Sequence, residues 1–429
     1  MDTLPLIVPG DPDVRRIVAG RAIRGFADGF VSVLLAQYLT NLGFSPAQVG
    51  AIVTGTLLGS AVLTLGFGLR GHRVGLRALL LVAGVVMAAT GTGFAAFTWF
   101  WPLLVVAVVG TLNPSSGDVS VFLPTEQAYL AERVDQPHRP HVFARYNLAA
   151  ILAAALGALA SALPTTVARW TGASVVHAQR ASFLGYALAG LVILVIYRRL
   201  SRTPEVVVAG SRRRALHTSQ RTVFELTALF SVDAAAGGFV ITSLLVLWLH
   251  LRFGLSPGTT AAVFFAAGLL GAASQLLAPR LSARIGLVRT MAFTHLPASA
   301  LLVVAALAPT SGLAIACLLG RALLSQMDVP ARQSLVMAVV MPDERAAAAS
   351  VTNVPRSLAA ATTPLLAGVL LTHSSFGWPL VIAGLGKMAY DLALLALYHD
   401  LPEEAGARRS SGSGVGLTPP ADPPRPDDG

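Results

Sequence analysis

Residues 328–340 read DVPARQSLVMAVV, and they reveal the organisation of the whole chain because an earlier stretch repeats their pattern. At an offset of 206 residues, identical residues stand at Pro124 and Pro330, Gln127 and Gln333, Arg139 and Arg345, and Asn147 and Asn353. At an offset of 211, matches join Gly43 to Gly254, Ser45-Pro46 to Ser256-Pro257, Arg73 to Arg284, and Gly75-Leu76 to Gly286-Leu287. The chain therefore consists of two halves, each of about 200 residues, that share one design.

The composition favours a lipid bilayer as the solvent of both halves. Hydrophobic residues make up 54% of the chain and charged residues 12%, with a mean hydropathy of +0.68. Soluble domains carry about 25% charged residues. The net charge is +10, but the arginines stand in loops between apolar segments rather than on one amphipathic face. We therefore expect no nucleic-acid partner.

A helix that crosses a membrane needs about 20 mostly apolar residues. The sequence contains twelve such segments, and the first, fourth, seventh and tenth are long and interrupted by polar residues. They cover 17–42, 47–69, 76–98, 102–133, 140–164, 180–198, 222–251, 257–279, 287–309, 312–340, 345–373 and 377–400. We predict an all-α membrane protein with twelve transmembrane helices in two pseudo-symmetric six-helix bundles around a central cavity.

The loops fix the expected domains and orientation. Basic residues gather in the loops after even-numbered segments, which places those loops in the cytoplasm, and all five tryptophans fall near the opposite interface. We expect a multi-pass protein of the cell inner membrane or plasma membrane with both termini cytoplasmic. Its expected parts are a cytoplasmic N-terminal segment (1–16), a first bundle (17–200), a basic cytoplasmic linker (201–221), a second bundle (222–400) and a disordered cytoplasmic tail (401–429).

The sequence gives no indication of a bound cofactor or metal. Cys317 is the lone cysteine and lies in an apolar run, and His250, His295 and His373 are scattered without the spacing of metal ligands. A phosphate-binding Gly-x-x-x-x-Gly-Lys-Ser/Thr loop is absent, so ATP is not the expected energy source. We expect a proton gradient in its place.

Two loops of the repeat carry a family resemblance. After the second segment the chain reads GLRGHRVGLR, and after the eighth it reads PRLSARIGLV, which keeps Arg-x-Gly in both places. With the twelve segments and the basic linker, this pattern resembles the major facilitator superfamily. The matching residues are Gly68, His72, Arg73, Gly75 and Arg77 in the first loop, and Arg284 and Gly286 in the second. The family's loop aspartate, which anchors a charge network closing the cytoplasmic side, is replaced by His72 and Ala283, and a protonated His72 is one substitute for it.

Charged residues inside the apolar segments are the candidate functional residues, because such residues are costly in a bilayer and face a cavity or a partner. A carboxylate that has lost its water binds a proton readily, which is the chemistry of proton coupling. The candidates for that role are Asp28, Glu126, Asp118, Asp233 and Asp328. Asp28 is the first choice, with a local pair to Arg24 as the alternative.

Substrate binding or gating is the role expected of a second group. Its members are Arg24, Gln127, Tyr146, Asn147, Arg321, Arg332, Gln333, Asn353 and Arg356. Asn147 and Asn353 also suit a scaffold role, since amides join helices. Arg356 is an anion candidate because Ala150 stands at its matching position. Lys387 and Asp391, one turn apart, are expected to pair with each other.

Four of these charges occupy related positions with exchanged signs. Glu126 matches Arg332, and aligning Gly29-Phe30 with Gly238-Phe239 places Arg24 opposite Asp233. We predict that the four form ion pairs within or between the halves. The pairs would either be static or hold one access state and release in the other.

The leading functional hypothesis is a secondary active transporter that works by alternating access. We expect proton-coupled efflux of an amphipathic or drug-like compound, with proton-coupled uptake of a small organic anion as the alternative. A polytopic membrane enzyme and a non-transporting sensor are the alternatives from other classes, and enzyme activity is not expected. The expected partners are a small-molecule substrate and the lipid bilayer, and the expected state is a monomer.

Overall fold

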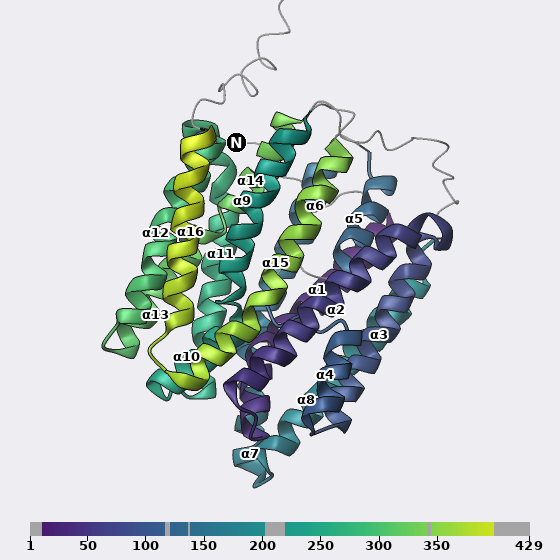
Figure 1. Ribbon diagram of the computed structural model, residues 1–429. Helices are drawn as coiled ribbons and strands as arrows, with labels where there is room; N and C mark the ends of the chain where they lie inside the picture. Colours follow the sequence, from purple (N-terminus) through teal and green to yellow (C-terminus); the bar gives the residue numbers. More distant parts are fainter. Residues whose placement is uncertain (1–10, 116–120, 136–137, 202–218, 341–344, 399–429) are drawn as a thin grey trace, which may run out of the picture.

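The computed structural model describes residues 11–115, 121–135, 138–201, 219–340 and 345–398. All sixteen elements in these ranges are α-helices (Figure 1). The first half contains α1 (Pro12–Asn41), α2 (Pro46–Val74), α3 (Leu76–Ala96), α4 (Phe100–Val109), α5 (Phe122–Arg133), α6 (Arg139–Ala160), α7 (Leu163–Thr171) and α8 (Val175–Arg198). The second contains α9 (Gln220–Gly238), α10 (Thr242–Phe253), α11 (Pro257–Ile285), α12 (Leu287–Leu307), α13 (Ser311–Ser325), α14 (Asp328–Val339), α15 (Arg345–His373) and α16 (Trp378–Tyr398).

The repeat in the sequence reappears in the ends of the helices. α2 and α3 begin and end 211 residues before α11 and α12, and α5 begins and ends 206 residues before α14. Glycines with a positive φ also recur, at Gly43 and Gly254 and at Gly75 and Gly286, where a side chain would strain the turn between two helices. The two halves therefore share their backbone plan as well as their sequence pattern.

Nine stretches of the described residues are long and apolar enough to cross a membrane, and α4 and α13 are shorter apolar helices. The predicted number of twelve is not established by this measure. Each predicted segment nevertheless falls on one helix or on two consecutive helices, since α4–α5, α9–α10 and α13–α14 are pairs separated by a break. The polar residues of the first segment do not break its helix, since α1 is continuous from Pro12 to Asn41.

Both chain ends of the described part lie at one face of the molecule, here called the linker face. Asp13, near the start of α1, accepts a hydrogen bond from the backbone nitrogen of Ser201 at 3.1 Å, so α1 begins beside the end of the first half. Tyr398, at the end of α16, donates to Glu225 near the start of α9 at 3.4 Å. The opposite face, here called the far face, holds α7 and α10 at the bottom of Figure 1.

Asp13 ties three segments together at the linker face. Its carboxylate also accepts hydrogen bonds from Tyr129 at 2.8 Å and from Arg16 at 2.7 Å. Burial opposes its ionisation, but the hydrogen bonds from Ser201, Tyr129 and Arg16 outweigh burial, so the pKa of the Asp13 carboxyl lies below its ordinary value. The start of α1 is thus fixed to α5 and to the beginning of the linker.

The two halves meet through small residues close to the far face. α2 packs on α15 and α6 packs on α11. A Cβ at Gly50 would lie 2.5 Å from the carbonyl oxygen of Pro364, and a Cβ at Gly268 would lie 2.8 Å from Cβ of Ala155. These glycines allow the helices of opposite halves to approach closely, as small residues do at helix contacts in membranes.

Candidate functional site

The first half encloses a buried ion pair between α1 and α5. Arg24 Nη2 lies 2.8 Å from Glu126 Oε2, and the two side chains are 2% and 0% exposed. Tyr197 of α8 donates to Glu126 Oε1 at 2.6 Å, and Tyr146 of α6 donates to Oε2. The carboxylate therefore meets one cation and two hydroxyl groups, which compensates its charge in the interior.

Asp28 stands one turn beyond Arg24 on α1, where the alternative prediction paired the two. The structure instead joins Arg24 to Glu126, and no ion pair within 4 Å joins Asp28 to a described side chain. Asp28 is buried and lies near Arg24, Arg21 and the Asn113 side chain at the break between α4 and α5. It is therefore a buried carboxylate beside a helix break, and the local-pair interpretation is wrong.

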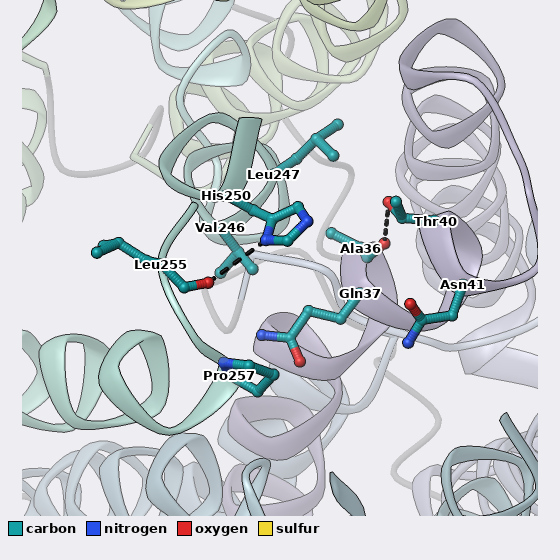
Figure 2. A pocket seen from close by; sticks show the side chains of 9 residues that line it. All are labelled: Ala36, Gln37, Thr40, Asn41, Val246, Leu247, His250, Leu255 and Pro257. Atoms are coloured by element: carbon teal, nitrogen blue, oxygen red, sulfur yellow. Dashed lines mark hydrogen bonds between the residues drawn. The ribbon is translucent and has the colours of Figure 1, made fainter. Parts of the chain in front are cut away.

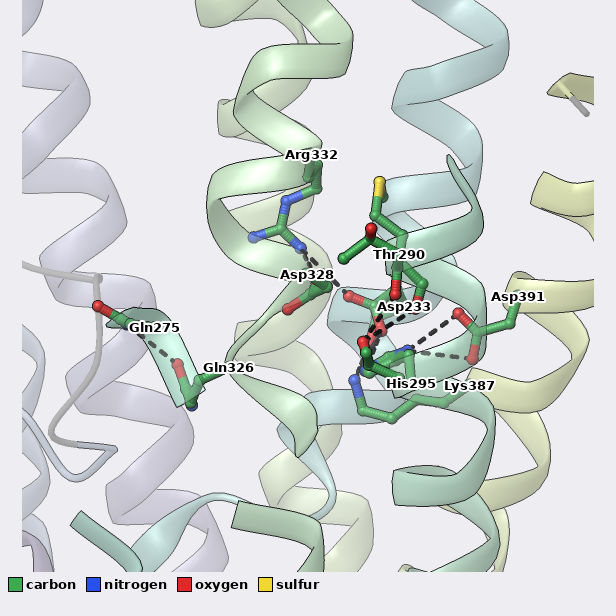
Figure 3. A network of polar contacts seen from close by, with 11 residues as sticks. Asp233, Gln275, Thr290, His295, Gln326, Asp328, Arg332, Lys387 and Asp391 are labelled. Carbon is green, nitrogen blue, oxygen red and sulfur yellow. Dashed lines mark hydrogen bonds and ion pairs between the residues drawn. The ribbon is translucent and has the colours of Figure 1, made fainter. Parts of the chain in front are cut away.

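The second half holds a larger polar cluster around Asp233 of α9 (Figure 3). Lys387 Nζ of α16 lies 2.6 Å from Asp233 Oδ1, and Arg332 Nη1 of α14 lies 3.6 Å from Oδ2. Arg332 also pairs with Asp328, four residues earlier on the same helix face, at 3.1 Å. One carboxylate therefore binds cations from two other helices.

His295 of α12 extends this cluster to Asp391 of α16. Its Nδ1 lies 3.0 and 3.1 Å from the two Asp391 oxygens, and its Nε2 lies 3.9 Å from Asp233 Oδ1. The predicted pair of Lys387 with Asp391 is therefore wrong, because Lys387 binds Asp233 while Asp391 binds His295. The spacing of Lys387 and Asp391 along α16 showed only that the two side chains share a face of that helix. It gave no information about partners on other helices, here Asp233 of α9 and His295 of α12.

The sign exchange predicted from the repeat joins residues within each half. Arg24 and Glu126 pair in the first half, and Asp233 and Arg332 occupy the matching positions in the second. The cation thus stands on the first helix of one half and on the broken helix of the other. In the described residues, no ion pair within 4 Å crosses between the halves.

The remaining candidates are less closely assembled. Arg321 of α13 is half-buried and acts electrostatically on Asp233 and Asp328, without an ion pair inside 4 Å to any described residue. Gln127 and Arg356 are half-buried, whereas Asn147 and Asn353 are exposed. Asp118 and the side chain of Gln333 lie outside the described residues.

The signature loops are described only in part. The side chains of Gly68, His72 and Arg73 lie outside the described set, so the substitution of His72 for an aspartate stays a prediction. Arg77 donates to the carbonyl oxygen of Arg198 at the linker face, and Arg284 is exposed.

Hydrogen bonds between the halves gather near the far face. Ser243, at the start of α10, donates to the carbonyl oxygen of Ser32 at 2.7 Å and approaches that of Pro114 at 3.0 Å. Thr372 and Thr54 accept from backbone nitrogens across the α2–α15 contact at 3.1 and 2.9 Å. No hydrogen bond found between the halves in the described ranges lies at the linker face. Within the described ranges, the hydrogen bonds between the halves are therefore confined to the far-face side.

A small pocket opens in this far-face contact, between the end of α1 and α10 (Figure 2). Gln37 and Asn41 line it from α1, and His250 lines it from α10. The pocket lies toward the far ends of these helices and away from both charge clusters. Among the described residues no group of three His, Cys, Asp or Glu side chains is placed to hold a metal ion, and this includes the cluster around Asp233.

Sequence reasoning missed three members of these clusters. Tyr197 was not among the candidates, His295 was considered only as a metal ligand and set aside, and Lys387 was assigned to the wrong partner. His295 has no counterpart in the first half, since Gly84 stands 211 residues before it. A lone polar residue in an apolar segment was the only available signal, and it does not identify a partner.

Comparison with known proteins agrees with this architecture. The family model of the Major Facilitator Superfamily matches residues 17–325 and 234–423. An uncharacterized membrane protein of Saccharomyces cerevisiae, YJR124C, is 22% identical over 420 residues, covering 90% of this chain and 94% of its own. The chain belongs to the major facilitator superfamily.

Solved transporters share the fold at low identity. The xylose transporter XylE from E. coli, in an inward open conformation, superposes with a TM-score of 0.69 at 14% identity, covering 92% of this chain and 97% of its own. The nucleoside transporter NupG gives a TM-score of 0.65 at 13% identity, with 89% and 98% covered. Likeness at this level shows the fold, and the chain is a multi-pass membrane protein with a transporter fold.

Proposed function

We propose that this member of the superfamily is a proton-coupled secondary transporter that exports a small amphipathic or drug-like compound from the cytoplasm by alternating access. In this proposal the linker face is cytoplasmic, as the basic linker predicts. The substrate enters between the halves from that face and leaves at the far face after the halves rock about their contact. The protein works as a monomer, since each half supplies one wall of the path.

The observation that carries the proposal is the position of the hydrogen bonds between the halves, which in the described part of the chain lie near the far face. Hydrogen bonds such as those of Ser243 and Thr372 join the halves near the far face, while the charge clusters lie inside each half. A molecule built in this way can open at one face and close at the other by breaking one set of contacts. The small-residue packing of α2 on α15 supplies a tight but largely apolar seam for that motion.

Proton coupling is supported by the buried carboxylates of both halves. Asp28 lies beside the break between α4 and α5, and it has the fewest compensating contacts of the buried carboxylates that the structure describes in the first half. Glu126 is buried more deeply but is bound by Arg24 and two tyrosines. Asp28 therefore remains our first candidate for the coupling carboxylate, with Glu126 second.

Arg321 favours a second candidate function, the proton-coupled uptake of a small organic anion. This side chain continues the inward face of α13 formed by Ala314, Cys317 and Leu318, at the spacing of successive helical turns. A guanidinium that faces inward and has no carboxylate within 4 Å among the described residues suits a carboxylate or phosphate ligand.

Proton release by the purified protein tests both candidates. The protein is placed in weakly buffered solution and exposed to a panel of hydrophobic cations, antibiotics and organic acids, with Asp28→Asn as the matched variant. Release on adding an amphipathic compound, lost in the variant, supports export, whereas a response to organic acids alone that Arg321→Gln abolishes supports the second candidate. Binding without release for every compound, seen as a rise in Tm, would refute proton coupling.

A further inference from the structure

His295 occupies a place that the repeat leaves to a glycine in the first half. The matching residue of α3 is Gly84, and a Cβ on the facing Gly190 of α8 would lie 2.7 Å from the backbone nitrogen of Ala88 and 3.1 Å from the carbonyl oxygen of Gly84. There the two helices pack backbone to backbone. In the second half the corresponding pair, α12 and α16, instead holds an imidazole against a carboxylate. The contact of His295 with Asp391 is therefore present in the second half and has no equivalent at the matching position of the first half.

The proton content of this contact is constrained by burial. Asp391 is 0% exposed, and in the described part of the chain its hydrogen-bond donor is His295 Nδ1. A buried carboxylate with one neutral donor is poorly compensated, so the pair gains stability by binding one more proton. At 3.0 and 3.1 Å from the imidazole nitrogen, the two Asp391 oxygens are close enough to share that proton with it.

The surrounding charges oppose that proton. Asp233, Asp328 and Asp391 carry three negative charges, which Lys387, Arg332 and Arg321 balance when His295 is neutral. An added proton therefore leaves the cluster with one excess positive charge. The poorly compensated carboxylate of Asp391 favours binding of the extra proton, whereas the excess positive charge of the whole cluster disfavours it. Because these two effects oppose each other, the His295–Asp391 pair can change its protonation state, as a proton-carrying site must.

We propose that His295 and Asp391 form a second proton-binding site, on α12 and α16, and that its proton loosens the hold of Asp233 on Arg332. This inference deepens the proposed proton coupling and rests on it. His295 Nε2 lies 3.9 Å from Asp233 Oδ1, too far for a hydrogen bond, and a lone pair there faces a carboxylate oxygen. Protonation turns this contact into an attractive one and adds a cation to Asp233.

Protonation of His295 weakens the attachment of α14 to α9. Asp233 then attracts three cations, His295, Lys387 and Arg332. Arg332 is held more weakly than Lys387, because it lies 3.6 Å from Asp233 whereas Lys387 lies 2.6 Å away. Arg332 retains Asp328 of its own helix at 3.1 Å, so it can leave Asp233 without losing its carboxylate. Since α14 is the linker-side part of the broken pair α13–α14, its release from α9 frees the linker end of that segment.

The groups that face this site come from each element packed around α12. They are Asp233 of α9, Arg321 of α13, Asp328 and Arg332 of α14, and Lys387, Tyr390 and Asp391 of α16. α11 also packs on α12, and no described contact brings a titratable side chain of α11 to His295.

A distance measurement across the linker face tests the proposal without a substrate. Spin labels are attached at Glu132→Cys on α5 and Ser334→Cys on α14, both exposed, in a Cys317→Ser background reconstituted in lipid nanodiscs. We expect the distance distribution to shift between about pH 5 and pH 8, with the ratio of its populations changing by at most about tenfold per pH unit for a single proton. His295→Gln and Asp391→Asn should each abolish the shift, and exposed His177→Gln should retain it.

A shift that persists in both variants would overturn the proposal, and so would a wild-type distribution that does not change with pH. Nitrogen-15 NMR of labelled histidine gives a check that does not depend on motion. Among the histidine signals that titrate in the wild type, one should disappear in His295→Gln and move in Asp391→Asn. The absence of such a signal would also refute the site. The proton-release screen reports on substrate coupling, so the two hypotheses can fail separately.

Discussion

Removing Arg24 while keeping Glu126 is the sharpest test of the charge cluster in the first half. Glu126 is fully buried, and its partners are the guanidinium at 2.8 Å and the hydroxyls of Tyr146 and Tyr197. In Arg24→Gln the carboxylate keeps only neutral donors, and it must either bear an uncompensated charge in the interior or bind a proton. Either outcome lowers the free energy of unfolding.

The expected cost follows from the geometry of the pair. Loss of one partner from a buried ion pair costs about 3–5 kcal/mol, and the two tyrosine hydrogen bonds that remain place Arg24→Gln at the lower end, about 3 kcal/mol. Arg24→Gln combined with Glu126→Gln removes both charges. We expect the double variant to be more stable than the sum of the single changes predicts, by about 0.5–3 kcal/mol.

The surface provides a matched control for this measurement. Arg221 and Glu225 also lie 2.8 Å apart, but their side chains are 93% and 43% exposed. Arg221→Gln should therefore cost less than about 1 kcal/mol. Denaturant unfolding of the purified variants in detergent gives the four free energies. The reasoning is refuted if Arg24→Gln costs no more than Arg221→Gln, or if the two buried changes are simply additive.

Two further predictions concern the far face and the linker face. Gly50→Leu should destabilise the contact of α2 with α15, because even a Cβ at this position would lie 2.5 Å from the carbonyl oxygen of Pro364. Overpacking of this kind costs about 1–3 kcal/mol, and the labelling of cysteines engineered at the far face should therefore increase. Asp13→Asn should lower the Tm at neutral pH. Because the pKa of Asp13 is lowered in the folded protein, its contribution is complete above the ordinary Asp pKa of about 3.9 and is lost as the pH falls through the folded value, so Tm scans of variant and wild type should converge in acid.

The backbone plan was largely predictable because the repeat carries it. Matches such as Gly75 with Gly286 mark turns that only glycine adopts without strain, so they fix where helices end in both halves. The breaks inside membrane segments were less visible. Asn113-Pro114 indicated the break between α4 and α5, whereas the break after α9 lacks a proline and follows Gly237-Gly238, and glycine is also frequent inside membrane helices.

The buried charges were predictable as a set, but their partners were only partly so. Symmetry predicted that Arg24, Glu126, Asp233 and Arg332 form ion pairs but left open whether the pairs lie within or between the halves, and the structure shows them within each half. It failed for His295, because a residue without a counterpart in the repeat has no second example to locate it. Partners of that kind follow from how α12 and α16 are rotated against each other, and apolar patterns leave this rotation open.

The exchange of signs between the halves has a physical consequence that a repeat of identical charges would lack. Glu126 of α5 and Arg332 of α14 stand at matching positions on segments that share their helix ends. Had both been carboxylates, any motion that brought α5 toward α14 at the linker face would have brought like charges together in a medium that screens them weakly. With a carboxylate on one segment and a guanidinium on the other, the same motion is attractive. Each residue also has a partner within its own half when the segments are apart. The charges therefore remain compensated whether or not the linker face is closed.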